Sequence, residues 1–121
     1  MPTIRPMIHV PDVRRAAEWY VSIGFALDSA FEDTGEMTWA ALSFGDGAIM
    51  LNAGGRSSEA DRREVDLYVD VADVEALFDR IQARVHVQEP LHTTFYGMRE
   101  FIIRDLNGFW ITFGQPMSDG D

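Results

Sequence analysis

The chain contains the same short pattern twice, and this repeat constrains the fold more than any other feature. Val10-Pro11-Asp12-Val13 begins one amphipathic stretch, and Val71-Ala72-Asp73-Val74 begins another about half the chain length later. Each copy follows an alternating apolar run and precedes a run with helical periodicity. The sequence therefore predicts two similar modules in series, each a strand, a helix and further strands.

The first module is predicted over residues about 3–53. It begins with a strand at 3–10, in which Pro6 favours an edge position. Asp12 is placed to cap a helix that ends before Gly24. Three short strands are then expected at about 25–31, 37–44 and 48–52.

The polar, Gly- and Ser-rich residues 54–63 are predicted to link the modules. The second module, about 64–116, begins with an alternating strand at 64–71, and Asp73 then caps a helix. The apolar stripe of this helix is expected to run from Val74 to Val85. Strands follow at about 85–89, 97–104 and 109–114, the last two joined by a hairpin turn.

This order predicts an α+β fold of two tandem βαβββ modules within one domain, residues 1–121. A helix covers one face of each sheet, so the other face must meet something else. We expect the curved mixed sheets to enclose a cleft, with the helices outside. The polar strand residues expected to point into the cleft are Arg5, His9, Asp66, Tyr68, Asp70, Trp110 and Thr112.

Composition excludes several classes of function. The chain has no cysteine, which rules out disulfides, thiolate metal sites and cysteine nucleophiles. Its ten cations are all Arg, and the net charge of −10 repels nucleic acid. No segment has the length of an apolar membrane span, and no leader pattern is visible, so a cytoplasmic location without membrane attachment is the default expectation.

Several motifs together resemble a known family. Trp19-Tyr20 precedes Ile23-Gly24-Phe25, and the second module contains Tyr96-Gly97-Met98-Arg99-Glu100-Phe101 followed by Asp105-Leu106-Asn107-Gly108. With the paired modules, these motifs resemble the vicinal oxygen chelate superfamily, which includes glyoxalases, bleomycin-resistance proteins and extradiol dioxygenases. The resemblance covers residues 3–116 and departs at Leu106, where the family usually has proline. It implies the predicted fold and a homodimer, in which modules of two chains commonly pair.

The resemblance also implies four positions at which the family's enzymes hold a divalent metal. They correspond here to Arg5, to Met50 or, if the register is shifted by one, Leu51, and to Asp66 and Thr112. Only Asp66 is a plausible donor, since a guanidinium cannot coordinate a metal. We therefore expect no metal or other cofactor, and an ion pair between Arg5 and Asp66. A displaced metal site using His9 with Asp66 or Asp70 is the alternative.

The remaining residues favour a pocket for a planar or cationic small molecule, because aromatic rings stack on such ligands. Residues 91–96 are expected to form an adaptable loop beside it. Arg99 and Glu100 alternate on one strand, so only one of them can enter the cleft, and the sequence leaves open which. The predicted ligand-binding residues are Arg5, His9, Trp39, Met50, Asp66, Tyr68, Phe95, Tyr96, Arg99, Glu100, Trp110 and Thr112.

Two main functions fit these features. The first is sequestration of an antibiotic-like molecule without catalysis, as the resemblance to bleomycin-resistance proteins implies. The second is a lyase, isomerase or dioxygenase with an atypical metal site, or a metal-free catalyst with Asp66, His9 or Glu100 as general base. A third possibility is a subunit that completes an assembly. The balance is against an enzyme.

Overall fold

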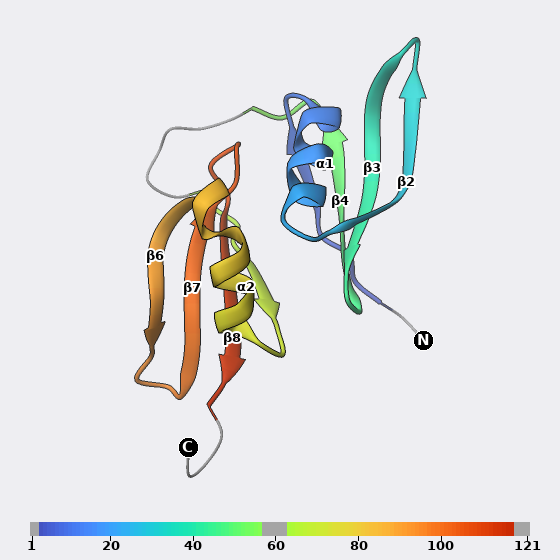
Figure 1. The fold of residues 1–121 in the computed structure, drawn as a ribbon. Helices are drawn as coiled ribbons and strands as arrows, with labels where there is room; N and C mark the ends of the chain where they lie inside the picture. The colour runs from blue at the N-terminus through green and yellow to red at the C-terminus, as the bar shows by residue number, and fades with distance from the viewer. Residues whose placement is uncertain (1–2, 57–62, 118–121) are drawn as a thin grey trace. The chain divides into compact units, whose positions relative to one another are not determined.

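The computed structural model describes residues 3–56 and 63–117. The chain divides into two compact units, residues 1–58 and residues 59–121 (Figure 1). Their boundary falls inside the predicted linker, whose residues 57–62 lie outside the described part. No helix of the described residues is long and apolar enough to cross a membrane.

The first unit contains the predicted strand, helix and three further strands. They are β1 (Met7–Val10), α1 (Val13–Ser22), β2 (Ala26–Asp33), β3 (Glu36–Phe44) and β4 (Gly47–Ala53). The sheet order is β1-β4-β3-β2, with β1 parallel to β4 and the other neighbours antiparallel.

The second unit repeats this arrangement. Its elements are β5 (Leu67–Asp70), α2 (Val74–Ile81), the 3₁₀ turn η1 (Gln82–Arg84), β6 (His86–Thr93), β7 (Met98–Arg104) and β8 (Trp110–Pro116). The sheet order β5-β8-β7-β6 is that of the first unit, and β5 and β8 are the parallel pair. The predicted α+β fold of two βαβββ modules is confirmed.

Both helices begin at the aspartates of the repeated motif. The Asp12 carboxylate accepts a hydrogen bond from the backbone N–H of Arg15 at 3.0 Å, and that of Asp73 accepts one from Ala76 at 3.1 Å. Each bond satisfies a backbone donor that the first helical turn leaves without a partner. The predicted caps are confirmed, and they explain why the repeat has Asp at this position.

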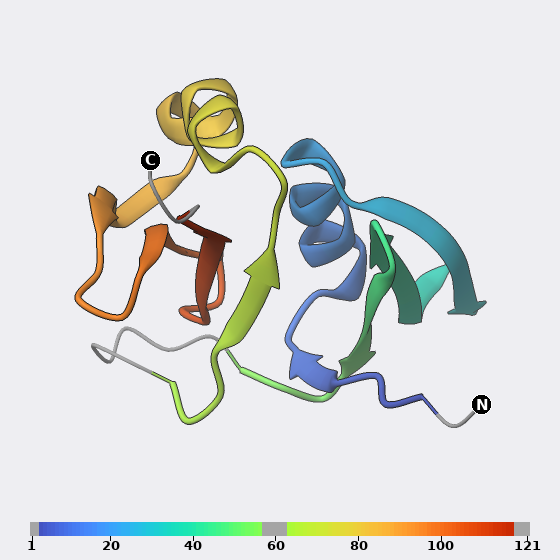
Figure 2. The ribbon, with the colours of Figure 1, turned by 90° about the horizontal axis from the view of Figure 1, so that it is seen from below.

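The core of each unit lies between its helix and one face of its sheet. In the first unit, Tyr20 of α1 is fully buried and meets Phe25 edge-on at a centroid distance of 5.0 Å. In the second, Phe78 of α2 meets Phe101 at 5.0 Å, and Phe101 stacks on Phe113 at 5.1 Å. Figure 2 shows α2 on one side of its sheet. Neither helix covers the opposite face of its own sheet.

Several predicted boundaries were wrong. β1 begins at Met7 rather than at residue 3, immediately after Pro6, which has no N–H to donate to a strand ladder. β5 begins at Leu67, and Val65 before it is 48% exposed, although the alternating pattern extended the strand to residue 64. α2 ends at Ile81, so the 3₁₀ turn separates Val85 from the helix.

The predicted hairpin turn between β7 and β8 is confirmed. The backbone N–H of Asp105 donates to the carbonyl of Phe109 at 2.8 Å. One oxygen of the buried Asp105 carboxylate accepts bonds from the N–H groups of Asn107 and Phe109 at 2.8 and 2.9 Å. Gly108 has a φ of 90°, a conformation that glycine adopts without strain. The turn therefore closes fully with Leu106 where the family usually has proline.

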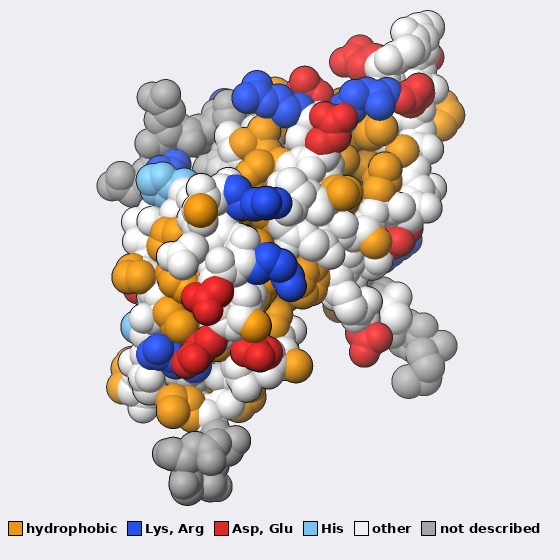
Figure 3. Space-filling model, viewed as in Figure 1, with side chains coloured by type: hydrophobic (Ala, Val, Ile, Leu, Met, Phe, Trp, Pro, Cys, Tyr) orange, Lys and Arg blue, Asp and Glu red, His pale blue; other side chains and the backbone are white. Residues whose placement is uncertain are grey.

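Charged side chains surround α2. Figure 3 shows acidic side chains gathered over the N-terminal end of this helix and basic ones toward its other end. Glu75 lies in the first turn and Arg80 in the last. This order matches the helix dipole, which favours negative charge at the N-terminus and positive charge at the C-terminus.

Candidate functional site: a buried carboxylate on the second sheet

The face of the second sheet opposite α2 contains the most unusual polar group of this unit. Phe101 and Phe113 face the helix, so strand alternation places Glu100 and Thr112 on the other face. The register pairs Ile102 with Thr112 and Glu100 with Gly114 across β7 and β8. This arrangement resolves which of Arg99 and Glu100 shares a face with Thr112: it is Glu100.

Glu100 is buried and is held by two tyrosines. Its side chain is only 2% exposed. The Tyr68 hydroxyl donates to Oε2 at 2.7 Å, and the Tyr96 hydroxyl donates to Oε1 at 2.8 Å. Tyr68 comes from β5, and Tyr96 comes from the turn between β6 and β7. Each carboxylate oxygen thus has a phenolic donor, and we call these three residues the Glu100 cluster.

Gly114 gives Tyr68 the space to reach Glu100. β8 lies between β5 and β7, so the Tyr68 side chain has to cross it. A Cβ atom at Gly114 would collide with the Tyr68 hydroxyl and its ring carbon, and would also press on Met98. A glycine inside a strand often marks such a close approach. The Glu100 cluster therefore requires glycine at position 114. The sequence alone did not identify this residue as part of the site.

The Glu100 carboxylate also changes the acidity of both tyrosines. Burial, then the hydrogen bond to Glu100 and its negative charge, raise the pKa of Tyr68 far above the usual value near 10. The hydrogen bond to Glu100 is the main cause that raises the pKa of Tyr96, with smaller contributions from desolvation and charge. Both phenols therefore keep their protons and act as donors at neutral pH.

Other predicted site residues lie on the same face of this unit. Thr112 is buried, and Tyr68, which pairs with it in the register, leaves half its surface exposed. Trp110 is two residues before Thr112 on β8 and so shares the face. Asp66 precedes β5 and is half-buried. The second sheet thus places Tyr68, Glu100, Trp110 and Thr112 on one face, and their role in ligand binding stays a prediction.

The expected adaptable loop at residues 91–96 was wrong. β6 continues to Thr93, so His92 lies inside the strand, and only a tight turn joins β6 to β7. The N–H of Thr94 donates to the carbonyl of Met98 at 2.8 Å. Phe95 in this turn is fully exposed.

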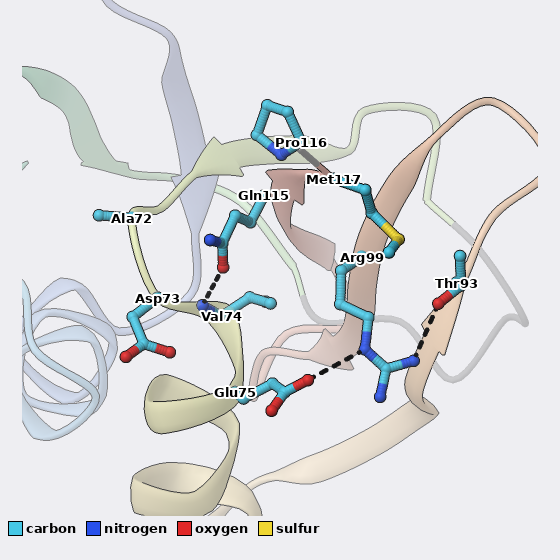
Figure 4. A pocket seen from close by; sticks show the side chains of 9 residues that line it. All are labelled: Ala72, Asp73, Val74, Glu75, Thr93, Arg99, Gln115, Pro116 and Met117. Atoms are coloured by element: carbon cyan, nitrogen blue, oxygen red, sulfur yellow. Dashed lines mark hydrogen bonds and ion pairs between the residues drawn. The ribbon is translucent and has the colours of Figure 1, made fainter. Parts of the chain in front are cut away.

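Arg99 lies on the opposite face, beside an open depression of about 610 Å³ at the start of α2. Figure 4 shows its guanidinium between Glu75 and Thr93. Nε is 3.4 Å from the Glu75 carboxylate, and a terminal nitrogen donates to the Thr93 hydroxyl at 3.2 Å. The residues that line the depression are Ala72, Asp73, Val74, Glu75, Thr93, Arg99, Gln115, Pro116 and Met117.

The polar groups of this depression already have partners within the unit. Asp73 caps α2, Glu75 pairs with Arg99, and the Gln115 side chain accepts the N–H of Val74 at 2.9 Å. These bonds hold the start of α2 against β8 and β7. They favour a structural role for the depression, whereas the Glu100 cluster has acceptor capacity left over.

The first unit groups three further predicted site residues. The register aligns His9 with Asn52 and Asn52 with Trp39, while Met50 lies opposite Met7. Ile8 and Val10 are buried, so His9 lies on the face opposite the core. Arg5 is exposed and precedes β1, so the strand assigns it no face. The expected ion pair between Arg5 and Asp66 stays a prediction.

The four positions at which the family's enzymes bind a metal do not fit such an ion in this chain. Arg5 is a permanent cation, Met50 offers only a thioether, and Thr112 offers only a hydroxyl. Among the residues that the structure describes, no three His, Asp or Glu side chains form a group that could hold a metal.

Comparisons with known proteins agree with this architecture. A family model described as Glyoxalase/Bleomycin resistance protein/Dioxygenase superfamily matches residues 4–113. No sequence among the curated proteins matches significantly.

Three solved structures illustrate how far the likeness extends. A protein of unknown function from Agrobacterium tumefaciens is 27% identical, with a TM-score of 0.73 and coverage of 97% of this chain and 95% of that one. A glyoxalase/bleomycin resistance protein/dioxygenase from Alicyclobacillus acidocaldarius is 17% identical, with a TM-score of 0.78 and coverage of 98% and 93%. The bleomycin-binding protein of Streptomyces verticillus, complexed with copper(II)-bleomycin, is 22% identical, with a TM-score of 0.71 and coverage of 98% of each chain.

Proposed function

Because this chain belongs to the Glyoxalase/Bleomycin resistance protein/Dioxygenase superfamily, we propose that it is a small-molecule-binding protein that sequesters its ligand without a metal. The ligand is a planar or cationic compound of antibiotic type. The fold it shares with bleomycin-binding proteins supports this class of function. Fold alone does not determine function, so the proposal depends on the residues of the site.

The observation that carries the proposal is the Glu100 cluster. A carboxylate that is 2% exposed and bonded to two tyrosyl hydroxyls is uncommon, because Glu side chains are seldom fully buried. It lies on a sheet face with Trp110 and Thr112, which provide an aromatic ring and a hydroxyl. Pockets that combine aromatic surface with a few fixed polar groups are typical of small-molecule sites.

A binding panel tests this function. Bleomycin and a planar polycyclic antibiotic are titrated into the full chain while tryptophan fluorescence and the melting temperature are recorded. A ligand at a hundred times its Kd should stabilise the native state by about 2.7 kcal/mol. Unchanged fluorescence and an unchanged melting temperature across the panel would refute sequestration of such compounds.

The alternative is an enzyme: a lyase, isomerase or dioxygenase with an atypical metal site, or a metal-free catalyst in which Glu100 is the base. The two hydrogen bonds to Glu100 oppose the metal-free case, because both carboxylate oxygens already accept a phenolic hydrogen, whereas a general base must reach a proton of the substrate. Metal analysis of the purified chain distinguishes the metal-dependent case, as do melting curves with added Zn, Mn, Ni or Fe. A stoichiometric metal that raises the melting temperature would favour the enzyme.

We also propose that the chain forms a homodimer. β2 is an edge strand whose eight residues are all exposed, including Phe31 at 60%. Exposed apolar edge strands favour association unless another chain covers them. Sedimentation equilibrium measures the mass directly, and a mass of 13.7 kDa, that of one chain, at all concentrations would refute the dimer.

A further inference from the structure

The Glu100 carboxylate has hydrogen-bonding capacity that its own unit does not use. An ionised carboxylate offers about four lone-pair sites on its two oxygens. The hydroxyls of Tyr68 and Tyr96 take one site on each oxygen. One acceptor direction on each oxygen is therefore left for a ligand that reaches this face of the sheet.

The negative charge of Glu100 also has no counter-ion among the described residues. The neighbouring Arg99 lies on the opposite face and pairs with Glu75 at 3.4 Å. His92, which is opposite Glu100 in the register, directs one ring nitrogen to the carbonyl of Pro90 at 2.8 Å and the other toward Glu89 at 3.8 Å. A buried carboxylate is stable when a positive charge compensates it, and the described residues of this unit do not supply one.

The two tyrosines bear on whether the Glu100 carboxylate binds a cation or acts as a base. Each oxygen of Glu100 already accepts a hydrogen bond from a phenol, which favours a role as a fixed hydrogen-bond acceptor over a role as a catalytic base. The tyrosine rings also flank the carboxylate, and an aromatic ring attracts a nearby cation through its electron-rich face. Both effects favour recognition of a cation over removal of a proton.

We propose that Glu100, flanked by Tyr68 and Tyr96, binds a cationic nitrogen group of the ligand, such as an amidinium or an ammonium. A planar amidinium presents two parallel N–H donors, the arrangement that pairs with the two oxygens of a carboxylate. The inference rests on the proposed binding function. It adds that the ligand carries a positive charge and that Glu100 is the residue that recognises it.

A matched pair of small probes tests the inference. Benzamidine and benzamide have nearly the same shape, but only benzamidine is charged at neutral pH. Each is titrated into the full chain at about 0.15 M salt, where long-range attraction to the acidic surface is screened. Amide chemical shifts in NMR spectra report affinity and location together. We expect benzamidine to bind at least about tenfold more tightly than benzamide, a difference of ~1.4 kcal/mol, and to shift the amides around Glu100.

Two variants that each remove one negative charge distinguish binding at Glu100 from general attraction to the acidic surface. Glu100→Gln keeps the size of the side chain and removes its charge, and it should abolish the preference for benzamidine. Glu36→Gln removes one charge from an exposed position at the start of β3 in the first unit and should leave the preference intact.

The possible outcomes are distinct. Equal affinity for the two probes, no binding of benzamidine, or an equal loss in both charge variants would overturn the inference. If Glu100→Gln does not fold, the unmodified chain provides the test. If benzamidine changes the amide chemical shifts of residues away from Glu100 only, the inference is overturned equally well. Bleomycin or the planar antibiotic could still bind in each of these cases, so the wider binding function fails only when its own panel fails.

Discussion

Gly114 is the position at which one added carbon atom would disturb the Glu100 cluster most directly. In Gly114→Ala the new methyl group would occupy the space of the Tyr68 hydroxyl. Tyr68 would have to turn away, and the buried Glu100 would lose one of its two donors. We expect the free energy of unfolding to fall by about 1–3 kcal/mol, the usual effect of leaving a buried polar group without its partner. Urea denaturation measures this change.

Gly47→Ala is the matched control for this substitution. Gly47 begins β4, and a Cβ atom there would make an ordinary contact of 3.6 Å with the carbonyl oxygen of Phe44. Its effect should stay within about 0.5 kcal/mol, as for other unconstrained surface positions. Equal stability of the Gly114 and Gly47 variants would show that Tyr68 does not need the space above β8.

The tyrosines also make the stability dependent on pH in the alkaline range. The raised pKa of Tyr68 means that the folded chain holds a proton which the unfolded chain releases above about pH 10. The free energy of unfolding should therefore decrease as the pH rises past this value. Tyr68→Phe removes this group and should make the decrease shallower. The chain has no Lys or Cys, so tyrosines are the side chains that titrate there.

Urea denaturation at about pH 8 and pH 11 measures this dependence in the unmodified chain and in Tyr68→Phe. Absorbance of the tyrosinate ion follows the titration independently. An identical decrease in both proteins would mean that Tyr68 has the same pKa in the folded and unfolded states, and that its bond to Glu100 is not maintained in solution.

The sequence predicted which residues alternate along a strand, but not which of them contact one another. Alternation along β7 predicted correctly that Arg99 and Glu100 face opposite ways, because the pleat determines relative orientation. It could not say which face of β7 meets α2, since that depends on how Phe101 packs against the helix. The reach of Tyr68 over Gly114 depends on a contact between strands that no local pattern encodes.

The two helices begin at equivalent aspartates, so the repeat predicts equivalent effects of mutation. Asp12→Ala and Asp73→Ala each remove a side-chain acceptor from the first helical turn. Each substitution should reduce the free energy of unfolding by about 1 kcal/mol. Asp46→Ala, in the exposed turn between β3 and β4, is the control and should change it by less than about 0.5 kcal/mol.

Thermal or urea denaturation of the three variants compares these effects. A difference between Asp12→Ala and Asp46→Ala would confirm that the cap contributes to stability in solution. If all three variants had the same stability, the capping bonds would contribute nothing beyond ordinary surface contacts, and the repeated aspartate would need another explanation.

The helix starts and the turn between β7 and β8 were predicted more accurately than the strand ends. Caps and turns depend on side chains close in sequence, such as Asp105 with Asn107 and Phe109. The length of β6 depends instead on how many of its residues pair with β7, as His92 does with Glu100. An alternating pattern extends equally well into residues that have no partner strand, which is why β5 was predicted to begin three residues too early.

The repeat predicted the topology of both units because each module must bury the apolar face of one helix against one sheet. Identical strand orders in the two sheets confirm this. Function is a different matter, since the same fold supports several kinds of chemistry. At that level the useful information is in the side chains at the positions that the resemblance assigns to a metal. Arg5 and Met50, for example, differ there from the His and Glu ligands of the family's enzymes.

The excess of negative charge predicts how the whole chain responds to salt. Carboxylates outnumber arginines two to one, which gives a net charge of −10, so repulsion between like charges opposes the compact state. The exposed ion pairs, Arg14 with Glu32 and Arg99 with Glu75, contribute about 0–1 kcal/mol each and are weakened by the same screening. Repulsion involves many more charges than the ion pairs do. The gain in stability when salt screens the repulsion should therefore exceed the loss when it weakens the ion pairs.

Raising NaCl from about 10 to 150 mM shortens the screening length from about 30 to 8 Å. We expect the melting temperature to rise by a few degrees, the shift that about 1 kcal/mol produces in a chain of this size. Chloride is the appropriate anion, because sulfate stabilises proteins through its exclusion from their surface. KCl should give the same result if screening is the cause. A melting temperature that falls with either salt would mean that the ion pairs outweigh the repulsion among the carboxylates.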